Sequence, residues 1–156
     1  MRDWTTVLRE CPEDLVLGHE IGLPHDPSSV YGREQVRVGM DGLVRLRWWQ
    51  GERAGEIEAE IDTGLVRQWA ALLAEVGFPA LPAAPPTRGA SYRVLEAEGA
   101  GLSTRILVPR VPLEFTPPFV ELFGLADALA ALLRGRPVFA KPDPTVGKVQ
   151  AIRPRV

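Results

Sequence analysis

The sequence has little cysteine, little lysine and no long apolar run. Cys11 is the only cysteine, so no disulfide can form within the chain, and a reducing cytoplasm fits this composition. No apolar run approaches the roughly 20 residues that a membrane-spanning helix needs. The first 20 residues carry five acidic residues and no apolar core of a signal peptide, so we expect a cytoplasmic protein that does not enter membranes.

Familiar catalytic motifs are also missing. No serine lies in a G-x-S-x-G pattern, and no glycine-rich phosphate loop is present. A reactive cysteine needs a positive environment, whereas Cys11 is flanked by Glu10, Glu13 and Asp14, which would raise the pKa of its thiol. We therefore expect inert packing of Cys11 and no cofactor, and the missing motifs favour a non-enzymatic protein.

The charges are unevenly distributed over the 156 residues. Sixteen of the 18 basic residues are arginine, which suggests a G+C-rich genome and fits a bacterial source. Residues 134–156 carry six basic residues and one acidic residue, whereas the remainder carries 12 basic and 19 acidic residues. We therefore predict one domain over residues 1–135 with an acidic surface, followed by an extended basic, proline-containing tail over residues 136–156.

The clearest helix is predicted over residues 62–79. Its apolar residues recur at the spacing of one buried helix face: Leu65, Val66, Trp69, Leu72, Leu73 and Val76. Asp62 is placed to cap the first turn, Gly77 is suited to a left-handed residue at the end, and Pro79 stops continuation. A second helix is predicted to begin at Thr116 as its cap, with Pro117 in the first turn, and to end at Gly135.

Alternating residues predict the strands. Residues 33–50 form a hairpin, and a three-residue turn with Gly42 left-handed pairs Val38 with Val44. A linker over residues 51–55 then leads to a strand over residues 56–61, which places three glutamates on one face. A second hairpin turns at residues 99–101, which pairs Val94 with Ile106 and Tyr92 with Val108.

The N-terminal part adds a short helix and one strand, over residues 3–21. Asp3 is the expected helix cap, and residues 14–21 alternate so that Leu15, Leu17, His19 and Ile21 share a face. The fold class is thus a single α+β domain, with an antiparallel sheet of five or six strands packed by two main helices on one face.

The order of the predicted elements over residues 33–134 is similar to that of a known group of small domains. A hairpin, a third strand, a tryptophan-bearing helix that ends in Gly77-Phe78-Pro79-Ala80-Leu81-Pro82, a glycine-turned hairpin and a last helix follow in order. This layout resembles small bacterial β-β-β-α-β-β-α domains, and it is similar to the emfourin-like inhibitors of thermolysin-type metalloproteases. The resemblance implies a small sheet with helices and a binding role, and it carries over no catalytic residue.

One cluster of potential metal ligands is present in the order H-E-x₄-H-D, at His19, Glu20, His25 and Asp26. A zinc protease motif needs two histidines four residues apart on a helix, whereas these two are six apart and Gly22 and Pro24 interrupt them. A partly buried strand histidine followed by a polar loop explains the same residues. If these four residues do bind a ligand, the chain is instead a small-molecule- or metal-binding domain with hydrolase activity around His19 and His25.

The polar face of the first hairpin carries Arg37, Arg45 and Arg47. Ion pairs with Glu56, Glu58 and Glu60 on the next strand explain these arginines without a nucleic-acid ligand. Trp48 belongs to the core, whereas Trp49 is left on the polar face, where it is either a protein-binding anchor or is covered by the N-terminal helix or the tail.

The basic tail is the other candidate for partner binding. It contributes Arg136, Phe139, Lys141, Lys148, Arg153 and Arg155. It could dock on a partner as an added strand, strap back onto the acidic body, or stay disordered. Its basic residues are too sparse to favour nucleic acid. The leading prediction is a non-enzymatic bacterial protein of the immunity, inhibitor or accessory type that binds another protein through Trp49, the arginine row and the tail.

Overall fold

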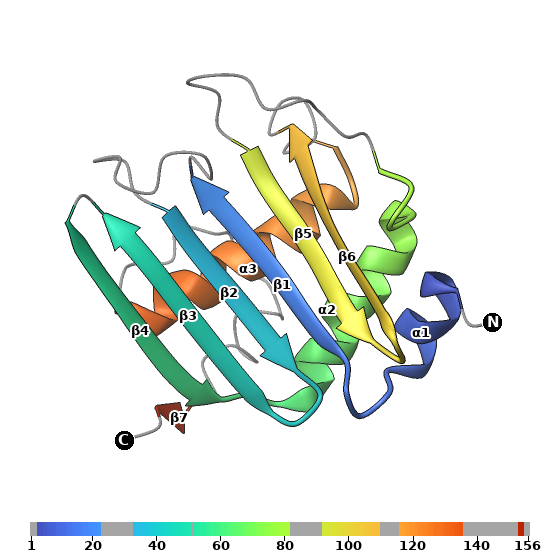
Figure 1. Ribbon diagram of the computed structural model, residues 1–156, viewed down its shortest axis with the longest axis horizontal. Coiled ribbons are helices and arrows are strands. Elements are labelled where there is room, and N and C mark those ends of the chain that lie inside the picture. Colours follow the sequence, from blue (N-terminus) through green and yellow to red (C-terminus); the bar gives the residue numbers. More distant parts are fainter. Residues whose placement is uncertain are drawn as a thin grey trace.

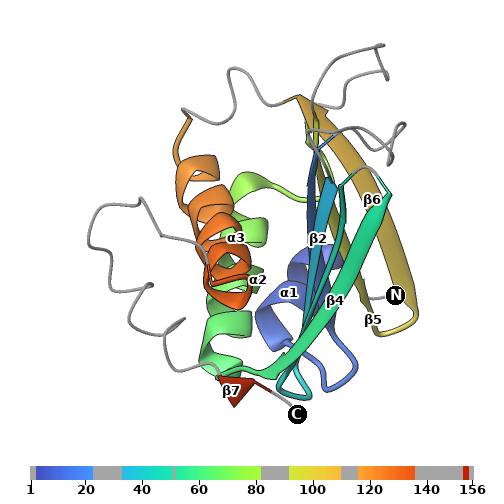
Figure 2. The same cartoon turned by 90° about the vertical axis from the view of Figure 1, so that its left-hand side faces the viewer.

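The computed structural model describes residues 3–22, 33–50, 52–81, 92–109, 116–135 and 153–154. These residues form a two-layer α+β fold, an antiparallel sheet with helices on one of its faces (Figures 1 and 2). The helices are α1 (Trp4–Glu10), α2 (Thr63–Val76) and α3 (Phe119–Leu133). The strands are β1 (Val16–Gly22), β2 (Arg33–Gly39), β3 (Leu43–Gln50), β4 (Arg53–Glu60), β5 (Tyr92–Gly99), β6 (Leu102–Pro109) and β7 (Arg153–Pro154).

The sheet has the order β6-β5-β1-β2-β3-β4-β7. Strand β1 is central, since it pairs antiparallel with β2 on one side and with β5 on the other. The meander β2-β3-β4 and the hairpin β5-β6 therefore lie on opposite sides of β1. Six long antiparallel strands confirm the predicted fold class, and the two-residue β7 adds to the outer edge of β4.

The first hairpin has the register that its apolar pattern predicts. Val38 pairs with Val44, and Gly42 is left-handed with φ 85°. The linker predicted over residues 51–55 is wrong, however, because β4 already begins at Arg53, which pairs with Gln50. Strands β3 and β4 thus form a second tight hairpin, and the three glutamates of β4 share one face as expected.

The register predicted for the β5-β6 hairpin is wrong by one residue. Val94 pairs with Leu107, and Tyr92 pairs with Pro109. The loop has two residues because Ala100 joins Gly101 in the left-handed region, with φ of 51° and 81°. The carboxylate of Asp14 accepts a hydrogen bond from the Ala100 N–H at 3.1 Å and supports this turn. A one-residue shift exchanges the two faces of a strand, so Arg93 and its alternate neighbours face the helices.

The helix ends follow the predicted capping in α1 and α2. Asp3 accepts from the N–H of Thr6 at 2.8 Å, Asp62 accepts from the N–H of Gly64 at 2.9 Å, and Gly77 ends α2 with φ 89°. The predicted cap of α3 is wrong. The helix starts at Phe119 with Pro118 as its cap, and no side chain caps it, because the proline ring offers no acceptor to the free N–H groups.

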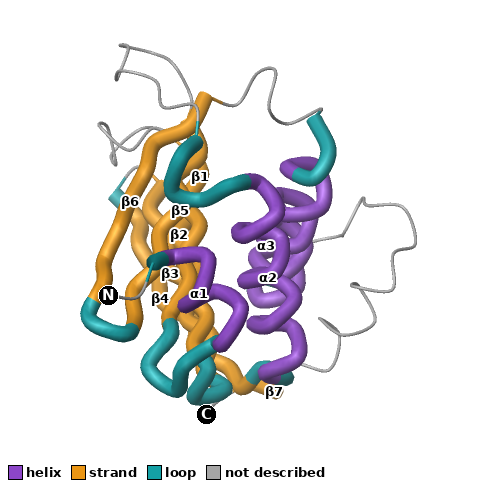
Figure 3. Tube along the Cα trace, turned by 90° about the vertical axis from the view of Figure 1, so that its right-hand side faces the viewer, coloured by secondary structure: helices purple, strands orange, loops and turns teal. Residues whose placement is uncertain are grey.

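The core lies between the sheet and all three helices (Figure 3). Its largest fully buried side chains include Trp69 and Leu73 of α2 and Leu122 and Leu129 of α3. Trp4 anchors α1 at one end of the core: its ring meets Phe78 edge-on at 5.5 Å, and its Nε1 donates to Thr104 Oγ1 at 2.9 Å. Within the described residues, no helix is both long and apolar enough to cross a membrane.

Candidate functional site

Among the residues that the structure describes, one face of the sheet carries no helix. All three helices pack on the opposite face, and we call the uncovered side the open face (Figures 2 and 3). Successive strand residues point to opposite sides of a sheet, so the register assigns each side chain to a face. The open face receives charged residues from six strands. These are Glu20 of β1, Arg33 and Arg37 of β2, Arg45 and Arg47 of β3, Glu56, Glu58 and Glu60 of β4, Glu96 and Glu98 of β5, and Arg105 of β6.

Strands β3 and β4 form the cross-strand ion pairs that the sequence predicts. Arg45 Nη2 lies 2.7 Å from Glu58 Oε1, and Arg45 Nε lies 2.9 Å from Glu56 Oε1. Arg47 Nε lies 3.3 Å from the other oxygen of Glu56. The hydrogen bond and charge of Glu58, with a smaller contribution from Glu56, raise the pKa of Arg45. These exposed groups are already paired, and each such pair stabilises the fold only weakly.

Arg37 pairs in the other direction, across β1. Its Nη2 lies 3.1 Å from Glu98 Oε2 and its Nε lies 3.5 Å from Glu96 Oε1, both on β5. Gly18 of β1 lies between these two strands, paired with Arg37 on one side and Glu96 on the other. A Cβ at Gly18 would collide with the Glu96 side chain. The missing side chain at Gly18 thus lets β2 and β5 interact across the central strand.

Glu20 is the most deeply buried charge of the open face, with only 2% of its side chain exposed. Arg33 pairs with one of its oxygens, and Arg105 Nη2 lies 2.7 Å from the other. Arg33 also stacks over the ring of Trp49, 4.8 Å from its centroid. Trp49 is half-buried as a result. A continuous row thus crosses the sheet, from Trp49 through Arg33 and Glu20 to Arg105.

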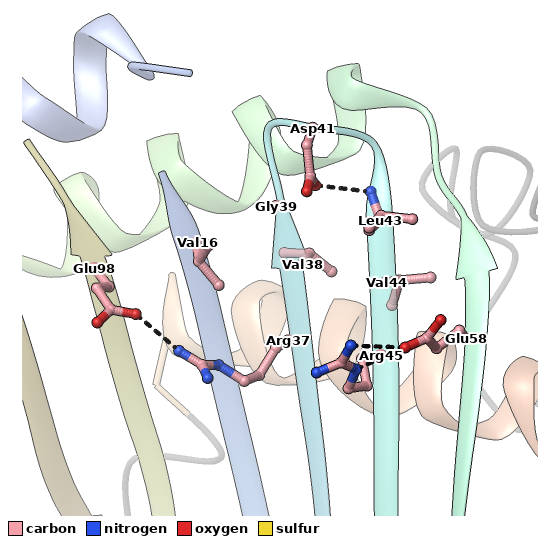
Figure 4. A pocket seen from close by; sticks show the side chains of 10 residues that line it. All are labelled: Val16, Arg37, Val38, Gly39, Asp41, Leu43, Val44, Arg45, Glu58 and Glu98. Atoms are coloured by element: carbon pink, nitrogen blue, oxygen red, sulfur yellow. Dashed lines mark hydrogen bonds and ion pairs between the residues drawn. The ribbon is translucent and has the colours of Figure 1, made fainter. Parts of the chain in front are cut away.

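A shallow depression of about 230 Å³ lies on the open face near the β2-β3 turn (Figure 4). Arg37 and Arg45, which are direct partners in the β2-β3 ladder, project beside each other there. Arg37 extends toward Glu98, and Arg45 is paired with Glu58. Since both guanidinium groups are already paired, the depression offers little free charge to a small anionic ligand.

The helix-covered face carries a second polar group. His19, paired with Leu95 in the β1-β5 ladder, has Nε2 2.9 Å from Arg93 Nη1. Arg93 also donates to both carboxylate oxygens of Asp127 on α3, at 2.8 and 2.9 Å. Because a guanidinium can only donate, Nε2 of His19 accepts and the imidazole is neutral. The predicted register placed Arg93 on the other face, so sequence reasoning missed this group.

The proposed metal ligands are not brought together where the structure describes them. His19 and Glu20 lie on opposite faces of β1, and both have arginine partners. His25 and Asp26 lie outside the described residues. Across residues 3–22, 33–50, 52–81, 92–109 and 116–135, no group of three His, Cys, Asp or Glu side chains is arranged to hold a metal ion.

Some of the remaining candidate residues lie within the described part of the chain, and others lie outside it. Arg153 lies in β7, paired with Glu60 of β4. Cys11 is buried behind α1, and its Sγ lies 3.3 Å from the carbonyl oxygen of Leu8. Burial raises the pKa of this thiol, whereas the sequence had suggested neighbouring carboxylates as the cause. Five tail residues fall outside the described part of the chain: Arg136, Phe139, Lys141, Lys148 and Arg155.

Comparison with known proteins adds no family to this picture. Neither the scan against protein-family models nor the comparison with curated proteins finds a match.

Proposed function

We propose that this chain is a non-enzymatic protein-binding domain of a bacterium, of the immunity, inhibitor or accessory type, and that it works in the cytoplasm. The observation that carries the proposal is the open face, a broad sheet surface over which the described part of the chain places no helix. It is ordered by arginine–glutamate pairs around a half-buried tryptophan. A flat surface of this kind suits a protein partner better than a small molecule, which needs a concave pocket.

The side chains of this surface favour protein recognition. Tryptophan and arginine are the residue types that most often dominate the binding energy of interfaces, and Trp49 and Arg33 stack on each other here. Arg33 is also held by Glu20, so binding would cost less side-chain entropy than with freely moving groups. Because the arginines are paired with glutamates, they are poorly available to phosphates, which favours a protein partner over nucleic acid.

The alternative, a metal- or small-molecule-binding domain with hydrolase activity, receives less support. It requires His19 and Glu20 to act on one ligand, and their side chains leave β1 on opposite faces. Nε2 of His19 accepts from Arg93, and Glu20 lies between two arginines. Metal analysis of tag-free protein separates the two functions, because stoichiometric zinc or nickel would favour the alternative.

A quantitative pull-down from the native host tests the binding proposal. The bait carries Trp49→Ala or Arg47→Glu on the open face. Arg67→Glu, at an exposed position of α2, serves as the matched control for the charge change. We expect a partner that wild type and Arg67→Glu recover equally, and that both open-face variants lose by at least about tenfold, the effect of one interface hot spot. Equal recovery by all four baits would contradict a role for the open face. A fifth bait without residues 136–156 measures the contribution of the tail.

A further inference from the structure

The charge balance around Glu20 differs from that of the other ion pairs on the open face. Arg37 and Arg45 each contact two glutamates, so their positive charges are fully matched. At Glu20 the ratio is reversed, because one carboxylate contacts both Arg33 and Arg105. One negative charge faces two positive charges, so this group keeps a net positive charge and is the exception to the full pairing of the open-face arginines.

The two arginines reach Glu20 from strands that are not neighbours. Arg33 lies on β2, on one side of β1. Arg105 lies on β6, where its direct ladder partner is Glu96 of β5, yet its side chain crosses β5 and places Nη2 2.7 Å from Glu20 on β1. Each arginine contacts a different oxygen of the same carboxylate. The fold thus brings two guanidinium groups together at one point near the middle of the sheet.

Burial differs between the carboxylate and the two cations. Only 2% of the Glu20 side chain is exposed, against 21% for Arg33 and 46% for Arg105. The contacts with Glu20 involve Nε of Arg33 and Nη2 of Arg105, whereas a guanidinium carries five N–H donors. Among the described residues, Glu20 is the only carboxylate in contact with either arginine. Donors therefore remain at the surface for a second carboxylate, while Glu20 holds both arginines from the sheet side.

The surroundings of this group limit the kind of anion that fits. Glu96 of β5 and Glu56 of β4 lie on the same face, on either side of it. A polyanion such as RNA would also meet these carboxylates and be repelled, whereas one acidic side chain balances the single surplus charge. Trp49, whose ring stacks on Arg33, adds apolar surface beside the arginines. The best match is a protein segment with one aspartate or glutamate next to an apolar side chain.

We propose that Arg33 and Arg105, held in place by Glu20, form a binding site for one carboxylate side chain of a protein partner, and that Trp49 packs against the apolar residue beside it. Arginine binds a carboxylate through paired N–H donors, and a guanidinium that is already held in position loses less entropy on binding. This inference rests on the proposed protein-binding function and states the chemistry of the partner.

An NMR titration of the full chain tests the site with defined probes. The arginine side chains are labelled with ¹⁵N, and acetyl-Leu-Glu-Leu-amide is added at constant ionic strength. We expect the Nε–H signals of Arg33 and Arg105 to shift saturably and that of Arg47 to shift far less. Acetyl-Leu-Gln-Leu-amide has the same shape without the charge, and it should bind at least about tenfold more weakly. Equal binding of the two peptides would contradict carboxylate recognition, and no saturable shift with either would overturn the site.

Two variants separate this site from the general charge of the face. Arg105→Gln should weaken binding of the glutamate peptide by at least about tenfold. Arg47→Gln removes the same charge from an arginine that is paired with Glu56, and it should leave the affinity nearly unchanged. The backbone amide spectrum shows whether both variants are folded, and the wild-type titration tests the site independently of them. Equal losses in the two variants would mean that only the overall charge attracts the peptide.

A short single-stranded oligothymidylate tests the competing class of partner. It should bind the protein more weakly than the glutamate peptide, and tighter binding that shifts the Arg33 and Arg105 signals would overturn the proposal in favour of nucleic acid. The pull-down separates this inference from the proposed function. If the peptide fails to bind but Trp49→Ala still loses its partner, the carboxylate site is wrong and the binding function stands. If the peptide binds but every bait recovers the same proteins, the site stands and the proposed function is wrong.

Discussion

Asp127 of α3 holds the guanidinium of Arg93 through two hydrogen bonds, of 2.8 and 2.9 Å. The two partners differ in their surroundings, since 5% of the Arg93 side chain and 46% of the Asp127 side chain is exposed. The ring of Phe123 lies 4.5 Å from the same guanidinium. A buried cation is thus neutralised by a carboxylate that reaches water, and the two residues should respond differently to substitution.

We expect Asp127→Ala to destabilise the protein more than Arg93→Met. The first change removes a carboxylate that makes two hydrogen bonds to a buried guanidinium, at a cost of about 2–3 kcal/mol in the free energy of unfolding. The second leaves Asp127 free to be hydrated and keeps an apolar side chain of similar length. Urea unfolding measures both, and Glu121→Ala, at an exposed position of the same helix, should change stability by less than about 0.5 kcal/mol. The reverse order of the two variants would contradict this account of the pair.

Glu20 should matter far more for stability than the glutamates at the edge of the same face. Its carboxylate is buried between Arg33 and Arg105. Glu20→Ala therefore leaves two arginines without their shared partner and removes the group that holds Arg33 over the Trp49 ring. We expect a loss of about 2–4 kcal/mol in the free energy of unfolding. Glu58→Ala, at an exposed pair, should cost less than about 1 kcal/mol. Equal effects in thermal or urea unfolding would show that burial does not set the cost.

Two glycine substitutions should have opposite effects. Gly18→Ala places a Cβ in the path of the Glu96 side chain and so disturbs the contact of Glu96 with Arg37, which should cost about 1–3 kcal/mol. Gly124→Ala adds a Cβ to an exposed position of α3 that has open space around it. It should stabilise the protein by about 0.5–1 kcal/mol, because glycine is a poor helix former. A shift of both midpoints in the same direction would contradict the role assigned to Gly18.

The buried thiol predicts a pH dependence. Burial raises the pKa of Cys11 in the folded protein, so at alkaline pH the unfolded chain releases this proton before the native protein does. The contribution to stability is complete below the unfolded pKa of about 8.5 and is lost as pH rises above it. We expect the free energy of unfolding to fall less steeply between about pH 8 and pH 10 in Cys11→Ala than in wild type. A thiol reagent should also react with the native protein much more slowly than with unfolded chain, and rapid native reaction would contradict the burial.

Two of the hairpins, β2-β3 and β5-β6, show when local sequence is enough to predict the register of a hairpin. In β2-β3, Gly42 marks the left-handed turn residue and only one register gives a single apolar face, so pattern and turn agree. In β5-β6, apolar residues lie on both faces, and the turn Gly99-Ala100-Gly101 permits a two- or a three-residue loop. The choice depends on Asp14, which precedes β1 and accepts from the Ala100 N–H. Because Asp14 is far from this turn in the sequence, the residues of the hairpin alone cannot predict the contact.

Some contacts of the candidate site were likewise predictable from the sequence, and others depended on the strand order. The pairing of Arg45 and Arg47 with the glutamates of β4 followed from the sequence, because it involves two strands that are consecutive in the chain and alternate in register. The pairing of Arg37 with β5 could not, because it needs β1 to lie between β2 and β5 with a glycine at the crossing point. His19 and Glu20 were proposed as joint metal ligands, and the strand places them on opposite faces.

By itself, the sequence determined the helices, their caps in α1 and α2, the first hairpin register and the α+β class. Each depends on interactions between residues close in the chain, or on one apolar face that has to be buried. Only the tertiary structure decided the strand order, the inward position of Arg93, the burial of Glu20 and the pairing of β7 with β4. These depend on which strands become neighbours, and the free energy of that choice comes from packing across the whole sheet rather than from any local pattern.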